Sequence, residues 1–194
     1  MKLFSAQNIS YSINEKKLFH NLSFEANSED GLHIKGANGS GKSTLLRIIL
    51  GITSPSKGSI RYSTEDLDIS YLGHKNAIKN YLTPIQNLEL LFNNSKLTNA
   101  FKWLHKLELT NVQDELAANL SFGQQKKLAL IRVLAESPQM IVLDEPFVGL
   151  DKVTGDLLNN FLVEKLSEGV GLILTSHIQP TIECKVLDLG KENV

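Results

Sequence analysis

Residues 36–43, Gly-Ala-Asn-Gly-Ser-Gly-Lys-Ser, constrain this chain more than any other segment. They lie between an apolar strand-like run, residues 31–35, and an apolar helix-like run, residues 44–50. Backbone N–H groups come within hydrogen-bond distance of phosphate oxygens only where side chains leave room, and the three glycines provide that room. A helix that starts directly after such a loop also points its free N–H groups and its dipole toward an anion. The segment therefore predicts a binding site for a nucleoside triphosphate.

Two side chains of this loop have expected roles of their own. Lys42 reaches the β and γ phosphates, where its charge also supports catalysis, and the Ser43 hydroxyl can ligate Mg²⁺. An ordinary glycine-rich turn is the alternative, and the strand before the loop and the helix after it argue against that turn. The residues that we expect to contact the nucleotide are Gly36, Ala37, Asn38, Gly39, Ser40, Gly41, Lys42, Ser43 and Thr44.

Length and composition limit the class of protein. With 194 residues the chain has room for one nucleotide-binding module and not for two. Its net charge is −1, from 20 Lys and Arg against 21 Asp and Glu without a basic block, so we expect no nucleic-acid partner. No apolar run approaches the ~18 residues of a membrane helix and no signal-peptide core is present, so we expect neither a membrane span nor export. A single cysteine, Cys184, excludes an internal disulfide and fits a reducing cytoplasm.

The hydrophobic pattern changes along the chain. The short alternating or apolar runs that predict strands outside the loop are residues 8–13, 22–26, 59–63 and 68–72. From residue 75 to 138 apolar residues recur at helical spacing, and Thr83-Pro84-Ile85-Gln86 forms a capping box at one helix start. Residues 93–96, Asn-Asn-Ser-Lys, are typical of a loop.

After residue 138 the pattern alternates between strand and helix. Apolar runs at residues 140–143 and 171–176 predict strands that are buried on both faces, and residues 151–166 predict a helix between them. Strands that alternate with helices imply an α/β fold with a largely parallel sheet. The phosphate loop should then lie at the carboxyl end of a strand of that sheet.

Two adjacent carboxylates follow the strand predicted at residues 140–143. Asp144 can hold Mg²⁺ directly or through water, and Glu145 can polarise the water that attacks the γ phosphate. A solvated acidic turn is the alternative, and the phosphate loop upstream argues against it. We therefore expect Glu145 to be the catalytic base and Asp144 to be a metal ligand.

The motifs after the phosphate loop follow an order that resembles the order in a known protein family. The motifs are Leu120-Ser121-Phe122-Gly123-Gln124, Asp144-Glu145-Pro146, Gly149-Leu150-Asp151 and Thr175-Ser176-His177. This order resembles that of the nucleotide-binding subunits of ABC transporters over nearly the whole chain. The resemblance implies an ABC-type P-loop ATPase fold, with a RecA-like parallel-sheet core, an N-terminal antiparallel β layer and an α-helical subdomain. It makes residues 1–194 one ATPase domain, in which residues 1–74 and 139–194 form the core and β layer and residues 75–138 form the helical subdomain.

The same resemblance implies a homodimer of ATPase subunits that hydrolyses ATP with Mg²⁺. Each nucleotide would lie between the phosphate loop of one subunit and a turn of the other that contains Ser121, Gly123 and Gln124. Tyr11 would stack on the adenine ring, Asp151 would lie in a loop that communicates across the dimer, and His177 would contact the γ phosphate as a catalytic residue. The residues alone leave simpler roles open, because Ser121 and Gln124 have capping-box spacing and Tyr11 can be a core residue.

The chain departs from the family pattern at two places. Phe122 stands where the usual signature has a glycine, which adds bulk beside Gly123. Gly73-His74-Lys75 stands where the family offers a glutamine that touches Mg²⁺ and links to the membrane partner. A neutral histidine can still ligate a metal ion, so His74 is a candidate ligand, with an exposed histidine of no such role as the alternative.

Residues 72–79, Leu-Gly-His-Lys-Asn-Ala-Ile-Lys, are similar to the corresponding stretch of the ATP-binding subunits of haem exporters in cytochrome c maturation. That resemblance implies a peripheral subunit at the cytoplasmic face of the bacterial inner membrane, bound to integral membrane permease subunits and coupling ATP turnover to haem delivery. Three alternatives remain. One is the ATPase subunit of another ABC exporter, one is a soluble ABC-type ATPase that acts on nucleic acid or ribosomes, and one is a nucleotide sensor without catalysis.

Overall fold

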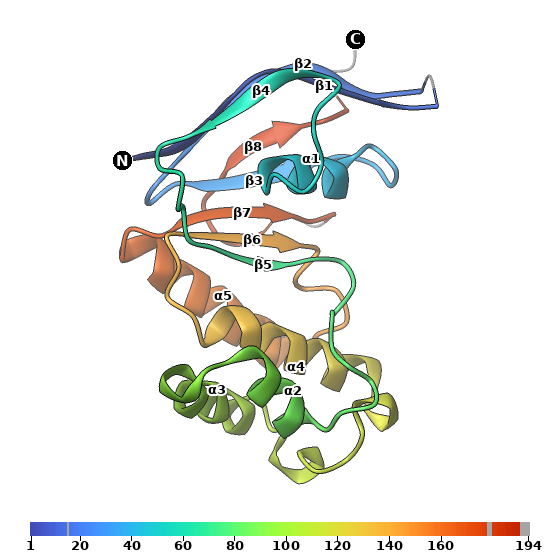
Figure 1. The fold of residues 1–194 in the computed structure, drawn as a ribbon, viewed down its shortest axis with the longest axis vertical. Coiled ribbons are helices and arrows are strands. Elements are labelled where there is room, and N and C mark those ends of the chain that lie inside the picture. Colours follow the sequence, from blue (N-terminus) through green and yellow to red (C-terminus); the bar gives the residue numbers. More distant parts are fainter. Residues whose placement is uncertain (15, 178–179, 191–194) are drawn as a thin grey trace.

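In the computed structural model, which describes residues 1–14, 16–177 and 180–190, two sheets form separate layers (Figure 1). The larger sheet is parallel and has the strand order β5 (Ile69–Leu72), β6 (Met140–Asp144), β7 (Gly171–Thr175), β3 (Gly31–Lys35), β8 (Lys185–Asp188). The smaller sheet is antiparallel and has the order β2 (Lys16–Asn27), β1 (Lys2–Ile13), β4 (Lys57–Tyr62). The α/β fold with a parallel core and an N-terminal antiparallel layer is therefore confirmed.

Helices cover both faces of the parallel sheet. Helix α1 (Lys42–Ile49) lies between the two sheets, and α4 (Phe122–Leu134) and α5 (Lys152–Ser167) lie on the other face of the parallel sheet (Figure 1). Farther from that face lie α2 (Pro84–Leu91) and α3 (Asn94–Lys106), with the short 3₁₀ turns η1 (Thr110–Val112) and η2 (Ala117–Asn119). No helix in the described part of the chain is both long and apolar enough to cross a membrane.

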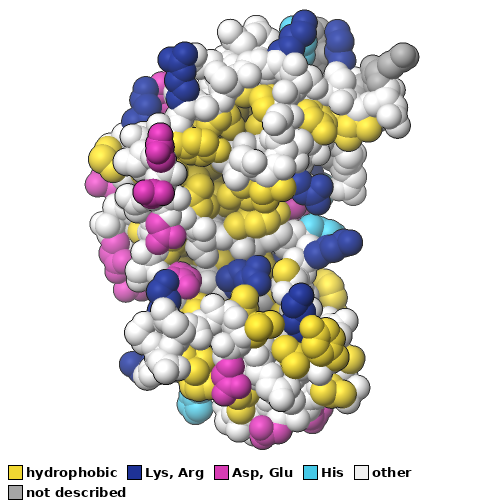
Figure 2. Space-filling model, viewed as in Figure 1, with side chains coloured by type: hydrophobic (Ala, Val, Ile, Leu, Met, Phe, Trp, Pro, Cys, Tyr) yellow, Lys and Arg dark blue, Asp and Glu magenta, His cyan; other side chains and the backbone are white. Residues whose placement is uncertain are grey.

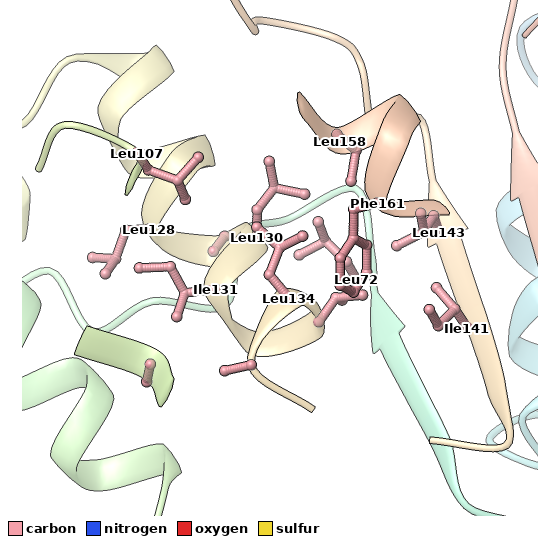
Figure 3. Close-up of a cluster of buried hydrophobic side chains, with 14 of the residues drawn as sticks. Leu72, Leu107, Leu128, Leu130, Ile131, Leu134, Ile141, Leu143, Leu158 and Phe161 are labelled. Carbon is pink, nitrogen blue, oxygen red and sulfur yellow. The ribbon is translucent and has the colours of Figure 1, made fainter. Parts of the chain in front are cut away.

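The central strands are buried on both faces because their side chains alternate between two hydrophobic clusters. Met140 and Val142 of β6 pack with α1 and the antiparallel layer. Ile141 and Leu143 pack with α4 and α5. In Figure 3, Leu130 and Leu134 of α4 and Phe161 of α5 point toward these strands. At about 25 cal/mol per Å² of apolar surface, such burial is the main contribution that holds the helices on the sheet.

The sequence misses one helix start. The prediction of a loop at residues 93–96 is wrong, because Asn93 is the N-cap of α3. Its side-chain oxygen accepts a hydrogen bond from the backbone N–H of Lys96 at 3.3 Å. The same polar composition serves a loop and a helix cap, because Asn and Ser side chains bond nearby backbone N–H groups in both. The capping box at Thr83 and Gln86 is confirmed, with both reciprocal bonds present.

The helical segment shares its core with the parallel sheet. Leu88 of α2 and Leu104 of α3 belong to the same buried cluster as Ile141 and Leu143 of β6. The division of the chain after residues 74 and 138 stays a prediction.

Candidate functional site

The phosphate loop lies where the sequence predicts it, between the carboxyl end of β3 and the start of α1. Gly41 is the N-cap of α1 at φ +100°, a conformation that favours glycine. Gly39 has φ +78°, and a Cβ there would meet no atom within 4 Å, so this position faces open space. Gly39 thus leaves space in which a ligand could lie. The other two glycines are required by packing within the protein: a Cβ on Gly36 would lie 2.5 Å from the Ser40 side chain, and a Cβ on Gly41 would lie 3.1 Å from the Phe19 ring.

A cavity of about 420 Å³ opens beside this loop. Its lining residues are Ile13, Leu18, Asn38, Gly39, Gly41, Lys42, Ser43, Thr44, His74, Asp144, Glu145 and His177. The structure thus brings together residues from β1, the phosphate loop, the segment after β5, the end of β6 and the segment after β7. His74 lies in this cavity with Ser43 and Asp144, and its role toward a metal stays a prediction.

Lys42 is buried and already aimed at the loop. Its Nζ donates to the carbonyl oxygens of Gly36 at 2.9 Å and Ala37 at 3.3 Å, and lies 3.9 Å from Glu145 Oε1. These carbonyls hold the ammonium over the loop at a place where it can exchange a carbonyl for a phosphate oxygen. Gly36 and Ala37 hold Lys42 through these carbonyls and do not line the cavity, and their contact with a nucleotide stays a prediction.

Asp144 presents one free oxygen to the site. Its Oδ1 accepts a hydrogen bond from the Thr175 hydroxyl at 2.7 Å, while its buried Oδ2 has no hydrogen-bond partner among the described residues. A buried carboxylate oxygen without a partner is costly unless a cation or donor meets it. Together with the Ser43 hydroxyl it offers the hard oxygen ligands that Mg²⁺ takes when phosphates complete its coordination. The residues present therefore fit a magnesium ion.

Glu145 is 8% exposed and has a positive φ of 50°, which is a strained conformation for a residue with a side chain. The Thr175 hydroxyl accepts a hydrogen bond from the Glu145 backbone N–H at 2.9 Å and helps to hold this conformation. The carboxylate meets His177 twice, through the backbone N–H at 3.3 Å and through Nε2 at 3.2 Å. The geometry places a carboxylate and an imidazole side by side in the cavity beside the phosphate loop.

Two residues of the site were not assigned from the sequence. Thr175 joins Asp144 to the Glu145 backbone, and its place at the end of β7, next to β6, is a signal that strand pairing could have given. Lys126 of α4 is 3% exposed and its Nζ donates to the Glu145 carbonyl oxygen at 3.3 Å. Burial lowers the pKa of Lys126, while the charges of Asp144 and Glu145 raise it. In the sequence Lys126 stands between Gln125 and Lys127, and such a polar run gives no sign that one of its lysines is buried.

The turn that contains Ser121, Gly123 and Gln124, called the signature turn below, lies at the start of α4 and outside the cavity of its own chain. Ser121 caps the helix, accepting from the Gln124 backbone N–H at 3.2 Å, and Gln124 returns a bond to the Ser121 N–H at 2.8 Å. The capping role expected from spacing is confirmed. Ser121, Gly123 and Gln124 do not line the cavity beside the phosphate loop, and their contact with a nucleotide stays a prediction.

The start of α4 is held against residues 149–151. Phe122 is 62% exposed, and its ring lies on Gly149, where a Cβ would come within 2.2 Å of the ring. Gly149 has φ +81°, so a side chain there would also strain the backbone. Lys127 pairs with Asp151 at 2.9 Å, and Asp151 caps α5 by accepting from the Thr154 N–H at 2.8 Å. The bond from Lys127, and then those from Thr154, lower the pKa of Asp151 to about 2.

The structure places Tyr11 outside the cavity, and its contact with the adenine ring stays a prediction. Its ring stacks on Phe19, with centroids 6.2 Å apart, and does not line the cavity. Ile13, two residues farther along β1, does line it, together with Leu18 of β2. Residues two apart in a strand share a face, so alternation alone cannot tell Tyr11 from Ile13. Ile13 is therefore a second candidate for the contact with the base.

Comparisons with known proteins agree with this geometry. A family model described as ABC transporter matches residues 19–148. The cytochrome c biogenesis ATP-binding export protein CcmA of Idiomarina loihiensis is 35% identical over 191 residues, which cover 93% of this chain and 88% of that protein. The protein of the same name from Rickettsia felis is also 35% identical, and the match covers 93% of this chain and 96% of that protein.

Solved structures share the fold. The ATP-binding subunit of an ABC transporter superposes with a TM-score of 0.84 at 23% identity, covering 97% of this chain and 87% of that one. A bacterial ABC transporter cassette solved as a dimer gives a TM-score of 0.81 at 23% identity, covering 97% of this chain and 95% of that one. At this identity the likeness shows the fold alone, and it confirms the fold class expected from the sequence.

Proposed function

The chain belongs to the ABC transporter family, and from that premise we propose that it powers an export step in the biogenesis of c-type cytochromes. It is an ATP-binding and ATP-hydrolysing subunit of that family. The observation that carries the proposal at the site is the shared cavity, where the phosphate loop meets Asp144, Glu145 and His177.

We assign the steps of hydrolysis to this chain's own residues. Lys42 leaves the loop carbonyls to meet the β and γ phosphates, and the N-terminus of α1 stabilises their charge. Glu145 accepts the proton of the attacking water, and His177, which lies 3.2 Å from that carboxylate, contacts the γ phosphate. A magnesium ion held by Ser43 and Asp144 would neutralise phosphate charge as it develops. Little covalent chemistry is needed, because phosphoryl transfer depends on positioning and charge.

The active form in this proposal is a head-to-tail dimer. Ser121 and Gly123 are exposed or half-exposed at the N-terminus of a 13-residue helix, where backbone N–H groups and the dipole favour an anion. Since they do not reach the cavity of their own chain, we assign them to the γ phosphate bound by a second copy. A cassette of the same fold was solved as a dimer.

The helical segment is the surface that we assign to the membrane subunits. It exposes large apolar side chains before and along α2, among them Tyr81 at 72% and Leu90 at 61%. Figure 2 shows apolar side chains gathered over the lower, helical part of the molecule, beside lysine or arginine side chains. Exposed apolar patches of this kind mark interaction sites. A permease bound here would hold the chain at the cytoplasmic face of the inner membrane as a peripheral subunit.

Haem is the cargo that we propose. Its support is the similarity to export proteins of cytochrome c biogenesis over most of both chains, together with the Gly73-His74-Lys75 segment. The test uses a strain that lacks this chain and receives either the wild type or Glu145→Gln. We expect the wild type alone to restore covalently bound haem in c-type cytochromes. Equal restoration by Glu145→Gln, or normal cytochromes without the chain, would contradict the proposal.

Mass spectrometry of the complex after gentle detergent extraction separates the remaining alternatives. We expect integral membrane subunits to copurify with the chain. Membrane subunits of a drug, lipid or ion exporter would indicate another cargo. Binding to RNA or DNA that weakens steeply with salt would instead favour an ATPase that acts on nucleic acid.

A further inference from the structure

His33 is a buried polar residue in the middle of β3 that has no part in the mechanism above. It is 2% exposed. Its neighbours Leu32 and Ile34 pack with α1 and the antiparallel layer, so alternation directs His33 to the other face of the sheet. Leu174, its partner in the β3–β7 register, lies in the apolar cluster of that face. A buried imidazole on an apolar face needs a hydrogen-bond partner.

That partner lies far along the sequence. Nε2 of His33 is 3.0 Å from the backbone carbonyl oxygen of Ser176, 143 residues away. A carbonyl oxygen only accepts, so Nε2 carries the proton and donates it. The bond joins the strand that leads into the phosphate loop to the residue directly before His177.

The position of His177 depends on that backbone. Its imidazole is 45% exposed, so side-chain packing restrains it little. Its contacts to Glu145, from the backbone N–H at 3.3 Å and from Nε2 at 3.2 Å, both depend on where residues 176 and 177 lie. A displacement of about 1 Å in a catalytic group can reduce the rate by up to about 100-fold.

We propose that His33 is a positioning residue for ATP hydrolysis: its Nε2–H holds the Ser176 carbonyl and so fixes His177 against Glu145. This inference rests on the proposed ATPase mechanism and adds a residue to it. His33 does not touch the nucleotide. It sets the place of a residue that does.

The side chains of Gln and Asn give a matched test. The amide nitrogen of Gln reaches about as far as Nε2 of histidine, whereas that of Asn reaches only as far as Nδ1. We expect His33→Leu and His33→Asn to lower kcat about 10- to 100-fold, with the Kd for ATP changed by about twofold at most. His33→Gln should recover kcat to within about threefold of the wild type. His105→Leu, the same change at an exposed position of α3, is the control for the loss of a histidine.

Three results would overturn the inference. In the first, His33→Leu keeps the wild-type kcat. In the second, the kcat of His33→Asn is as close to that of the wild type as the kcat of His33→Gln is. In the third, His33→Leu lowers kcat as strongly in a His177→Ala background as in the wild type, since residues that act through one another are not additive.

A second readout does not need turnover. In the NMR spectrum of the histidine ring protons, the His177 signal is identified by its loss in His177→Ala. We expect this signal to shift in His33→Leu and to stay in place in His33→Gln. An unshifted signal in His33→Leu would overturn the inference. A chain that failed to hydrolyse ATP would contradict the proposed function instead, and the His177 signal would still decide the role of His33.

Discussion

At the scale of single residues, Glu145 combines burial, a positive φ and two contacts to His177. We predict that Glu145→Gln keeps ATP binding and lowers kcat about 100- to 10,000-fold, the range that a general base contributes. The amide keeps the size of the side chain but accepts no proton. Steady-state phosphate release and an equilibrium titration with ATP measure the two effects.

Glu89→Gln on the exposed face of α2 is the matched control and should turn over like the wild type. Wild-type hydrolysis by Glu145→Gln would refute the assignment of the base. The backbone at residue 145 would then be strained for another reason.

Ile13 is predicted to contact the base of the nucleotide in place of Tyr11. Ile13→Ala should weaken ATP binding up to about tenfold, because it removes roughly 1.5 kcal/mol of apolar contact. Tyr11→Leu, which keeps an apolar side chain on Phe19, should change the affinity by about twofold at most. Calorimetric titration of ATP measures both. Greater loss with Tyr11→Leu than with Ile13→Ala would restore the original assignment of the aromatic residue.

Residues whose chemistry is local were predictable from the sequence. Lys42, Asp144 and Glu145 were found because a motif fixes both their spacing and their role. Thr175 and Lys126 were missed because their contacts to residues 144 and 145 come from strand pairing and from helix packing, which a local pattern does not contain. Ile13 lines the cavity and Tyr11 does not, a difference that alternation along the strand could not predict.

At the scale of elements, α4 and the segment before α5 are held together by Phe122 on Gly149. We predict that Gly149→Ala destabilises the fold by about 1–3 kcal/mol, since it combines a strained positive φ with a clash against the ring. Adding Phe122→Ala should recover the part due to the clash and leave the part due to φ. Denaturant unfolding of the four proteins of this cycle measures the coupling. Strictly additive effects would show that the ring does not press on Gly149.

The ion pair between Lys127 and Asp151 leads to a prediction about how the stability of the fold depends on pH. Asp151 has a folded-state pKa of about 2, below its ordinary value of 3.8, so its contribution to stability is present above about pH 4 and is lost as the pH falls toward 2. Lys127→Ala should raise this pKa toward the ordinary value, and only part of the way because the Thr154 bonds remain. An NMR titration of the Asp151 carboxyl carbon measures the shift. An unchanged pKa would show that the helix cap alone sets it.

Elements with a clear hydrophobic period were also predictable. The buried strands at residues 140–143 and 171–176 and the helix at residues 151–166 appear as β6, β7 and α5 with bounds shifted by one residue at most. The start of α3 was not predictable, because a polar Asn-Asn-Ser run is as common in a loop as at a helix N-cap. β1 and β2 are each 12 residues long, and their register shifts interrupt the alternation that would have shown their full length.

At the scale of the whole molecule, one chain holds half of each proposed site. The phosphate loop, Asp144 and Glu145 share a cavity, while the signature turn at Ser121 and Gly123 lies outside it. The completion by a second copy that we propose accounts for this separation. A sequence pattern contains no distance between the two halves, so only the fold supplies a geometric argument for the proposed second copy.

The most direct test is a structure of Glu145→Gln with ATP and Mg²⁺, with Lys42→Ala under the same conditions as the control that should lack nucleotide. We predict two copies arranged head to tail, each with the triphosphate in its own loop at residues 36–43 and with Ser121 and Gly123 of the other copy at the γ phosphate. An empty loop, or ATP bound there without any contact from a second signature turn, would contradict the account.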